Sequence, residues 1–285
     1  MPAPSHLVAD APLAPRTTLA VGGRAAWLAP CPDLASARAA LAFAAAERLP
    51  VAVLGGGSNT VVPDEGFDGV VLSPDMAGVA VRRDGPTVQL TVGAGEDWDA
   101  LVARTVAEGW AGLECLAGIP GRLGAAPIQN IGAYGQELAD TCEAVQTLDR
   151  VTGQVAWLRA ADCAFSYRHS RFKAEPGRHL VLAVRLRLTP GGAPTVRYAQ
   201  LAAALPAQPT LDEVRATVLR LRRGKSMVYD PADPNHRSAG SFFVNPVMAD
   251  AEADRVVARV AALGIHGPVP RWPAGAGRSK LSAAW

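Results

Sequence analysis

The sequence has little that would direct the chain into or across a membrane. Its most apolar stretch, residues 39–54, is interrupted by Glu47, Arg48 and Pro50, whereas a membrane span needs about 20 mostly apolar residues. The first 14 residues contain three prolines and no lysine or arginine, unlike a secretory signal. We therefore expect no membrane segment and a cytoplasmic location.

The sequence also lacks a large excess of positive or negative charge, and it lacks metal-binding motifs. The 28 basic and 26 acidic residues leave a net charge of +2, too small to attract a polyanion, which argues against a nucleic-acid binder. The four cysteines, Cys31, Cys115, Cys142 and Cys163, form no Cys-x-x-Cys pair, and no histidine cluster has metal-ligand spacing. We predict reduced thiols and no metal site, since a chain of this size builds its core without disulfides.

What the sequence does contain indicates a folded α+β protein. Hydrophobic residues make up 49% and charged residues 19% of the 285 positions, and at about 150 residues per domain the length suggests two domains. Capping residues, apolar spacing and turn signals predict an α+β body over residues 16–190 and a smaller α+β unit after residue 200. The predicted helices cover 33–48, 97–108, 211–223 and 250–263, and the predicted strands cover 51–54, 69–72, 79–83, 87–92, two segments flanking 151–154, and 180–188.

A run of small residues, Gly55-Gly-Gly-Ser-Asn-Thr60, follows directly on the strand predicted over 51–54. Consecutive small residues let main-chain N–H groups approach an anion closely, as phosphate-binding loops require. The run is not a Walker loop, because no Gly-Lys-Ser/Thr follows, and Thr60 breaks the Gly-x-Gly-x-x-Gly pattern. By itself it fits a plain tight turn as well as a phosphate site.

A second glycine-rich segment, residues 112–135, is more informative. It holds six glycines in 24 positions, and each costs about 1 kcal/mol relative to alanine inside a helix. We therefore predict a long loop region. Apolar residues such as Leu113, Leu116 and Ile119 alternate with the glycines and would be wasted on a flexible surface loop. The pattern favours close approach of the main chain to a ligand.

Two short motifs carry polar groups suited to catalysis. In Ser166-Tyr-Arg-His-Ser170 the planar guanidinium of Arg168 can hold a carboxylate through two N–H donors. In Gly240-Ser-Phe-Phe-Val-Asn-Pro246 a single hydroxyl stands beside two aromatic residues. Because the sequence has no Gly-x-Ser-x-Gly elbow, Ser241 is a better candidate for a proton donor than for a nucleophile. His169 and His236 are expected to be surface or supporting residues.

These segments, with Thr18-Leu-Ala-Val-Gly-Gly23 before them, resemble in order the motifs of the UDP-N-acetylenolpyruvoylglucosamine reductases, and Ala125-Ala-Pro-Ile-Gln-Asn130 resembles the type I branch. The resemblance implies an α+β protein with the two-subdomain FAD-binding fold of the vanillyl-alcohol-oxidase/PCMH type and a smaller α+β substrate domain. The implied limits are 1–75 and 76–195 for the two FAD-binding subdomains and 196–285 for a substrate-binding domain that is truncated at its C-terminal end.

The same resemblance implies roles for individual residues. Arg168 would stabilise negative charge on the substrate carboxylate, and Ser241 would be the general acid. The implied substrate-binding residues are Tyr167, Tyr198, Arg222, Lys225 and Asn245. The implied cofactor-binding residues are Gly55, Gly56, Gly57, Ser58, Asn59, Gly118, Ile119, Pro120, Gly124, Asn130, Gly132, Ala133, Tyr134 and Gly135.

The implied activity is NADPH-dependent, FAD-mediated reduction of UDP-N-acetylglucosamine enolpyruvate to UDP-N-acetylmuramate. This reaction belongs to peptidoglycan precursor synthesis, and through it to cell-wall biogenesis, cell shape and cell division. NADPH would reduce the flavin and leave before the sugar nucleotide enters the same site. The implied partners are these two small molecules, and we expect a monomer.

One departure from the family pattern leaves alternatives open. The family has a catalytic glutamate near its C-terminus, and no residue matches it here, because the acids after Ser241 are Asp250, Glu252 and Asp254 on the helix predicted over 250–263. Residues 279–285 resemble the start of a further helix leading into the missing stretch. The alternatives are an impaired or non-catalytic flavin-binding relative and a flavin oxidase of the same fold.

Overall fold

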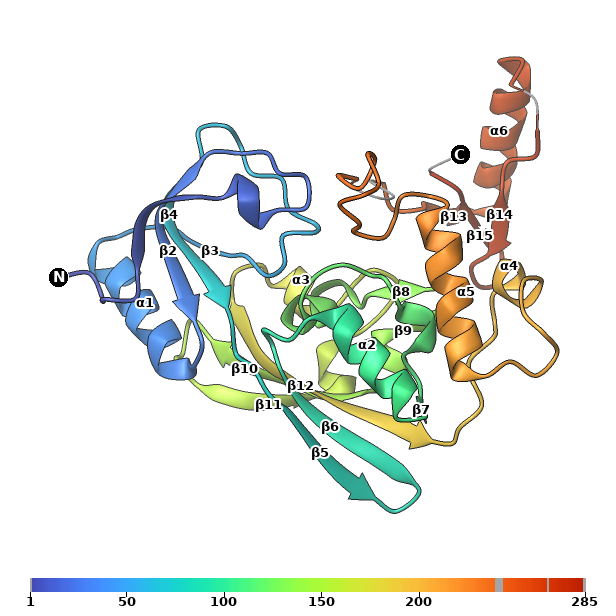
Figure 1. Cartoon of the computed structure of the whole chain (residues 1–285). Coiled ribbons are helices and arrows are strands. Elements are labelled where there is room, and N and C mark those ends of the chain that lie inside the picture. The colour runs from blue at the N-terminus through green and yellow to red at the C-terminus, as the bar shows by residue number, and fades with distance from the viewer. Residues whose placement is uncertain (1, 239–242, 266, 284–285) are drawn as a thin grey trace. The chain divides into compact units, whose positions relative to one another are not determined.

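The computed structural model describes residues 2–238, 243–265 and 267–283 (Figure 1). The chain divides into two compact units, Met1–Ser238 and Ala239–Trp285. Across the described residues, no helix combines the length and the apolar character that crossing a membrane requires.

The N-terminal part of the first unit is a four-stranded sheet in the order β1-β2-β4-β3 with a helix, α1, packed on it. The elements are β1 Val8–Pro12, β2 Arg24–Cys31, α1 Leu34–Ala46, β3 Val51–Val53 and β4 Phe67–Pro74. Asp33, the first residue of the helix predicted over 33–48, caps α1, because its carboxylate accepts a hydrogen bond of 2.7 Å from the Ser36 nitrogen. The helix and strands predicted between residues 33 and 72 are confirmed.

Strands β1 and β2 were not predicted from the sequence. β1 is exposed at four of its five positions, so it shows no alternation of buried and exposed residues. β2 is rich in alanine and contains Pro30, which are weak strand signals. It becomes a central strand because β1 pairs with one edge and β4 with the other.

A six-stranded antiparallel sheet forms the middle of the first unit, in the order β11-β10-β12-β6-β5 with β7 also paired to β12. Its strands are β5 Val79–Asp84, β6 Thr87–Gly93, β7 Trp110–Ala111, β10 Cys142–Asp149, β11 Val155–Arg159 and β12 His179–Pro190. The predicted hairpin of β5 and β6 is confirmed, and Gly85 in its turn has a φ of +58°. The strands predicted around residues 151–154 and over 180–188 are also present.

Helices cover one face of this sheet and create the largest core. Val88, Leu90 and Val184 share this core with residues of α2 Trp98–Ala107 and α5 Leu211–Arg223, the two long helices of this part of the chain. Both helices match the predictions: Asp97 caps α2, and a capping box of Thr210 and Glu213 begins α5. Two four-residue helices, α3 Arg171–Ala174 and α4 Ala199–Ala202, were not predicted.

The glycine-rich segment 112–135 is more ordered than the loop predicted for it. It contains the 3₁₀ helices Glu114–Leu116 and Leu123–Gln129 and the first strand of the hairpin β8 Gly132–Ala133 and β9 Gln136–Glu137. Leu113, Leu116 and Leu123 are fully buried in the large core, which confirms that the apolar residues of this segment are not on a flexible surface loop. Burial of these leucines orders the segment, and the glycines keep its backbone irregular.

The described residues of the second unit form a three-stranded antiparallel sheet and one helix. Its elements are β13 Val247–Ala249, α6 Asp250–Ala262, β14 Arg271–Pro273 and β15 Arg278–Leu281. The helix predicted over 250–263 is confirmed, but the helix start predicted at residue 279 is wrong. Lys280 pairs with Val247 on one side and Trp272 on the other, and Leu281 is buried, so this segment is the central strand of the sheet.

Candidate cofactor and substrate site

A cavity of about 570 Å³ lies between the two glycine-rich segments of the first unit. Five of the predicted cofactor residues line it: Gly55, Gly56, Gly118, Ile119 and Pro120. The wall is completed by Pro15, Arg16, Thr17, Thr18, Leu54, Ser73, Asp97, Asp99, Gly121, Arg122, Val228 and Tyr229. A cavity of this size is within the usual range for cofactor sites.

The two glycine loops touch each other at the cavity wall. The Ser58 hydroxyl donates a hydrogen bond of 2.9 Å to the Pro120 carbonyl. A Cβ atom on Gly56 would lie 2.7 Å from the Cα of Gly121, so neither loop has room for a side chain at this contact. Glycine is required here because the main chains themselves meet, which leaves backbone at the cavity wall. Asn59, further along the first loop, is exposed.

Gly57 is restricted for a second reason. Its φ is +67°, and a Cβ there would lie 2.0 Å from the Arg16 carbonyl oxygen. The Gly57 carbonyl in turn accepts a hydrogen bond of 3.1 Å from the Thr18 nitrogen. The segment around Thr18, which the sequence singled out as a motif, therefore lies against the first glycine loop and lines the same cavity.

Gly118 begins the second loop and is held at both of its main-chain polar groups. Asp99 Oδ1 accepts a hydrogen bond of 2.6 Å from its nitrogen, and Arg222 donates one of 3.1 Å to its carbonyl. Further along, Gly124 packs so closely on Ala94 that a Cβ would lie 2.8 Å from the Ala94 Cβ. Arg122 forms an ion pair with Asp75. These contacts fix the course of the loop along the cavity.

The residues predicted at the end of the glycine segment form a tight polar structure around Asn130. Its amide group donates to Glu137 Oε2 at 2.6 Å, and its carbonyl accepts from the Ala139 nitrogen at 2.9 Å. Asn130 is fully buried and has a φ of +44°. The structure therefore uses the Asn130 side chain to organise the β8–β9 region, with Gly132, Ala133, Tyr134 and Gly135 in the hairpin beside it.

Arg168 is brought to the same hairpin from 36 residues away. Its Nη2 donates to the Gly132 carbonyl at 2.5 Å, and its guanidinium lies 5.3 Å from the centre of the Tyr167 ring. The Arg168 backbone has a φ of +53°, and Lys173 Nζ donates to its carbonyl at 3.0 Å. Non-glycine residues with positive φ carry strain and cluster at functional sites.

Three further predicted substrate residues lie near this hairpin. The rings of Tyr134 and Tyr198 meet edge to face with their centres 5.6 Å apart. Lys225 is exposed and donates to the Gln200 side chain at 3.2 Å, on the helix that follows Tyr198. Arg222 is close enough to Arg168 and Tyr134 for their charges to influence it. The structure thus brings together Arg168, Tyr134, Tyr198 and Arg222 from four separate segments.

The electrostatics of this region follow from burial. Removal from water lowers the pKa of Arg222 from its usual range, and the neighbouring charge of Arg168 acts in the same direction. Burial also raises the pKa of the Tyr134 hydroxyl, although the positive charge of Arg222 opposes that rise. Arg222 Nε is buried and has no hydrogen-bond partner among the described residues, so part of its donor capacity is unused there.

Two predicted residues belong to the second unit. Asn245 Oδ1 accepts a hydrogen bond of 2.9 Å from the Ala283 nitrogen. Ser241, the predicted general acid, lies outside the described residues.

Sequence reasoning missed several residues of the cavity wall. Asp99 and Tyr229 line the cavity but belong to a helix and to the segment that follows α5, where no motif marks them. Local patterns carry no signal for them, because the partner of Asp99 at the site, Gly118, is 19 residues away in the chain.

The four cysteines are not candidates for chemistry. All are buried and free, and burial raises the pKa of Cys31, Cys115 and Cys142 to about 12 and that of Cys163 to about 11. A thiol is nucleophilic as its thiolate, so these side chains are inert at neutral pH. The described residues contain no group of three or more histidine, cysteine, aspartate or glutamate side chains that could hold a metal ion.

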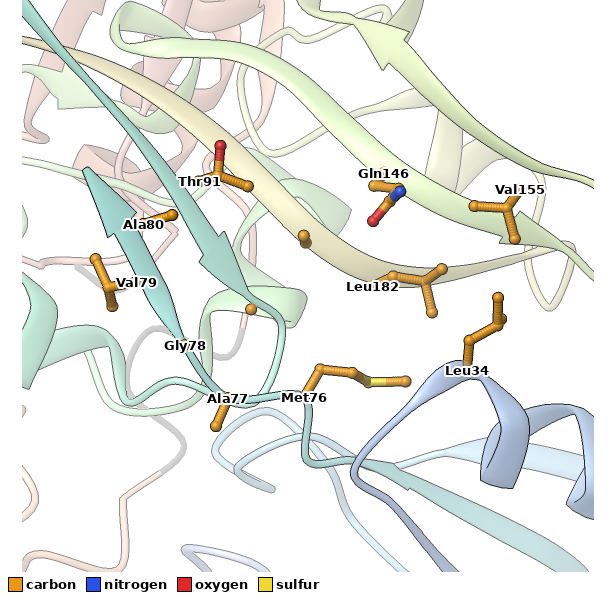
Figure 2. Close-up of a pocket in the computed structure, with 12 residues that line it drawn as sticks. Leu34, Met76, Ala77, Gly78, Val79, Ala80, Thr91, Gln146, Val155 and Leu182 are labelled. Carbon is orange, nitrogen blue, oxygen red and sulfur yellow. The ribbon is translucent and has the colours of Figure 1, made fainter. Parts of the chain in front are cut away.

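A second cavity of about 570 Å³ lies on the opposite face of the six-stranded sheet, beside the start of α1 (Figure 2). Its wall carries small and apolar side chains such as Met76, Ala80 and Leu182, with Thr91 and Gln146 as polar neighbours. None of its described lining residues is titratable, and none is a predicted site residue. It is therefore separate from the site built by the glycine loops.

Comparison with known proteins identifies the fold and the family. Residues 29–159 match the family described as FAD binding domain. The chain is 50% identical over 283 residues to UDP-N-acetylenolpyruvoylglucosamine reductase of Streptomyces coelicolor, covering 97% of this chain and 73% of that protein. The corresponding enzyme of Streptomyces avermitilis is 49% identical, with 97% and 77% covered.

A solved structure supports the same assignment. The crystal structure of UDP-N-acetylenolpyruvylglucosamine reductase from Thermus caldophilus superposes with a TM-score of 0.59 at 27% identity, covering 96% of this chain and 86% of that one. The class is therefore that of the FAD-dependent oxidoreductases, and the predicted α+β FAD-binding fold is confirmed. Within that class, the chain belongs to the UDP-N-acetylenolpyruvoylglucosamine reductase family.

Proposed function

We propose that this chain catalyses the NADPH-dependent reduction of UDP-N-acetylglucosamine enolpyruvate to UDP-N-acetylmuramate, with FAD as its resident cofactor. The observation that carries the proposal is the glycine-walled cavity between residues 55–56 and 118–122, in a chain that belongs to this reductase family. The chain's role is then in peptidoglycan precursor synthesis, and through it in cell shape and division.

The residues of the cavity fit a flavin dinucleotide. The main chains meet at Gly56 and Gly121, where a side chain would not fit. The wall there consists of backbone, and backbone N–H groups are what bind a pyrophosphate in such loops. We assign Gly55 to Asn59 to the pyrophosphate, and Gly118 to Gly124 and Asn130 to Gly135 to the rest of the cofactor. FAD bound there would supply the hydride-transfer chemistry between NADPH and the enolpyruvyl substrate.

Arg168 is the proposed stabiliser of developing charge. Hydride addition at the methylene carbon C3 of the enol ether leaves negative charge at C2, which spreads into the adjacent carboxylate. A fixed guanidinium near that carboxylate lowers the barrier, because it is already oriented before the charge develops. The bond from Arg168 to the Gly132 carbonyl and its strained backbone hold the group in one orientation.

Ser241 is the proposed general acid that delivers a proton to C2, which requires its hydroxyl within about 3 Å of that carbon. Hydride at C3 and a proton at C2 together complete the reduction of the double bond. We assign substrate contacts to Tyr167, Tyr198, Arg222, Lys225 and Asn245. Arg222 and Lys225 suit the diphosphate, since they add positive charge beside the hairpin of Tyr134.

The proposal also covers the domain limits of the chain, its oligomeric state and its location in the cell. We assign residues 1–75 and 76–195 to the two FAD-binding subdomains and 196–285 to substrate binding. We propose that the protein acts as a monomer in the cytoplasm on two small molecules, NADPH and the sugar nucleotide, and not on nucleic acid, in keeping with its net charge of +2.

An anaerobic two-step experiment tests the function. The FAD-loaded protein is first titrated with NADPH while flavin absorbance is followed, and the enolpyruvyl sugar nucleotide is then added. We expect bleaching in the first step, recovery of the oxidised spectrum in the second, and one equivalent of UDP-N-acetylmuramate. Bleaching without recovery would identify a non-catalytic relative. Flavin that stays with the chain after denaturation would instead support an oxidase with covalently tethered flavin.

A further inference from the structure

The carboxylate of Glu114 is fully buried at the start of the second glycine segment and is bound only by uncharged donors among the described residues. Oε2 accepts a hydrogen bond of 2.7 Å from the Gly112 nitrogen. Oε1 accepts one of 2.7 Å from the Thr195 nitrogen and one of 3.4 Å from Gln136 Nε2. Glu114 has no exposed surface, and a buried carboxylate is tolerated when several N–H groups point at it.

Gln136 and Cys115 extend this contact into a network. Gln136 Oε1 accepts a hydrogen bond of 3.0 Å from the Cys115 nitrogen, and the Cys115 thiol donates to the Thr195 carbonyl at 2.9 Å. Thr195 is therefore held at both its N–H and its carbonyl by neighbouring residues of one 3₁₀ helix, although it is 81 residues from Glu114 in the chain. The network joins the glycine segment, the β8–β9 hairpin and the segment that follows β12.

This anchored segment leads directly to a proposed substrate residue. Tyr198 follows Thr195 by three residues, which span at most about 10 Å of extended chain. Its ring packs edge to face on Tyr134 with a centroid distance of 5.6 Å. Gly135 contacts the same segment, because a Cβ there would lie 3.1 Å from the Arg197 Cβ. The position of Tyr198 against the hairpin thus depends on where Thr195 is held.

We propose that Glu114 is a positioning residue that sets the placement of Tyr198, and through it the affinity for the sugar nucleotide. This inference rests on the proposed function. A carboxylate is needed because it only accepts hydrogen bonds, and here it meets three donors. A glutamine of the same shape turns its own NH₂ toward at least one of them. Glu114 acts through Tyr198 and does not itself touch substrate or flavin.

The test compares holoenzymes carrying Glu114→Gln, Tyr198→Ala and both changes, with Glu108→Gln on the exposed end of α2 as the matched control. Binding of the sugar nucleotide to the oxidised protein is followed by the flavin difference spectrum. We expect Glu114→Gln to raise the Kd at least about tenfold while the rate of flavin reduction by NADPH stays within about threefold of wild type. In the Tyr198→Ala background, the same change is expected to have almost no further effect, because the two residues act as one unit. Unchanged binding by Glu114→Gln, or full additivity of the two effects, would overturn the proposal.

A second measurement does not depend on substrate. Amide hydrogen exchange of residues 193–203 is expected to be faster in Glu114→Gln than in wild type or Glu108→Gln, whereas exchange in α1 is unchanged. If Glu114→Gln does not fold, Cys115→Ala removes one bond to Thr195 and is expected to accelerate exchange in the same segment. Unaltered exchange there contradicts the positioning role. A wild-type protein that is not reoxidised by the sugar nucleotide contradicts the proposed function instead.

Discussion

Asp99 and Gly118 are joined by a hydrogen bond of 2.6 Å from the glycine nitrogen to the aspartate Oδ1. The other carboxylate oxygen of Asp99 lies 3.2 Å from Arg215 on α5, and Arg222 on the same helix donates to the Gly118 carbonyl. Gly118 has a φ of +70°. The glycine that begins the second loop is therefore held by α2 on one side and α5 on the other.

Asp99→Asn tests how much this contact contributes to cofactor binding. The amide keeps the size of the carboxylate but loses the charge that strengthens both the bond to Gly118 and the pair with Arg215. A charge-assisted hydrogen bond contributes about 1.5–3 kcal/mol, so we expect FAD affinity to fall at least about tenfold. The measurement is fluorescence of released FAD on dilution. Asp212→Asn, an exposed change in the first turn of α5, should release FAD like wild type, and equal release from both variants would contradict the role of Asp99.

Gly56→Ala tests the contact between the two glycine loops. The added methyl group would lie 2.7 Å from the Gly121 Cα and 3.2 Å from the Arg122 nitrogen, so one loop has to move. We expect loss of bound FAD and a lower midpoint of thermal unfolding. Gly224→Ala is the matched control, because its φ is −61° and its nearest neighbour would be 3.7 Å away. There we expect retention of FAD and equal or slightly higher stability.

Ser241→Ala separates the two half-reactions. Without the hydroxyl, no proton reaches C2 of the substrate, whereas hydride transfer from NADPH to the flavin does not involve this residue. We expect flavin reduction at the wild-type rate and product formation slowed by about 10² or more, in line with typical losses on removing a general acid. Stopped-flow absorbance under anaerobic conditions measures both steps. Loss of both half-reactions would refute the assignment of Ser241 as the acid.

Asp149→Asn is expected to change the dependence of stability on pH. The Asp149 carboxylate accepts from the Thr152 and Val151 nitrogens and pairs with Arg178, and these bonds lower its pKa from 3.8 to about 2. A folded-state pKa below the unfolded value stabilises the protein above pH 4, and this contribution is lost as pH falls toward 2. Urea unfolding between these pH values should show a shallower loss in Asp149→Asn than in wild type. Asp68→Asn on β4, which is exposed, is the control, and parallel curves for wild type and Asp149→Asn would contradict the prediction.

Local chemistry made part of the fold predictable. Asp33, Asp97 and Thr210 begin their helices through bonds to nitrogens three residues further on, so the cap and the helix lie within one short window of sequence. The hairpin at Gly85 is local in the same way. The glycine loops were recognisable because glycine is retained where backbone must meet backbone.

The remaining parts depend on partners distant in the chain. The pairing of β15 with both β13 and β14 turns a segment predicted to begin a helix into a central strand. Glu114 and Thr195 are 81 residues apart, and Asp99 and Gly118 lie on different elements. No pattern at one of these positions indicates the other, because the two residues of each pair meet only in the folded chain, where α2 and α5 pack on each other and on the 3₁₀ helix Glu114–Leu116.

The four buried thiols can be used to follow local unfolding of the protein. Cys31 lies in the core beneath α1, whereas Cys115, Cys142 and Cys163 lie in the core of the larger sheet. An alkylating reagent cannot reach any of these thiols until the core around it opens. The first peptide to be labelled under heat or urea therefore shows which of the two cores unfolds first. If bound flavin stabilises both cores, it should delay alkylation of all four cysteines together.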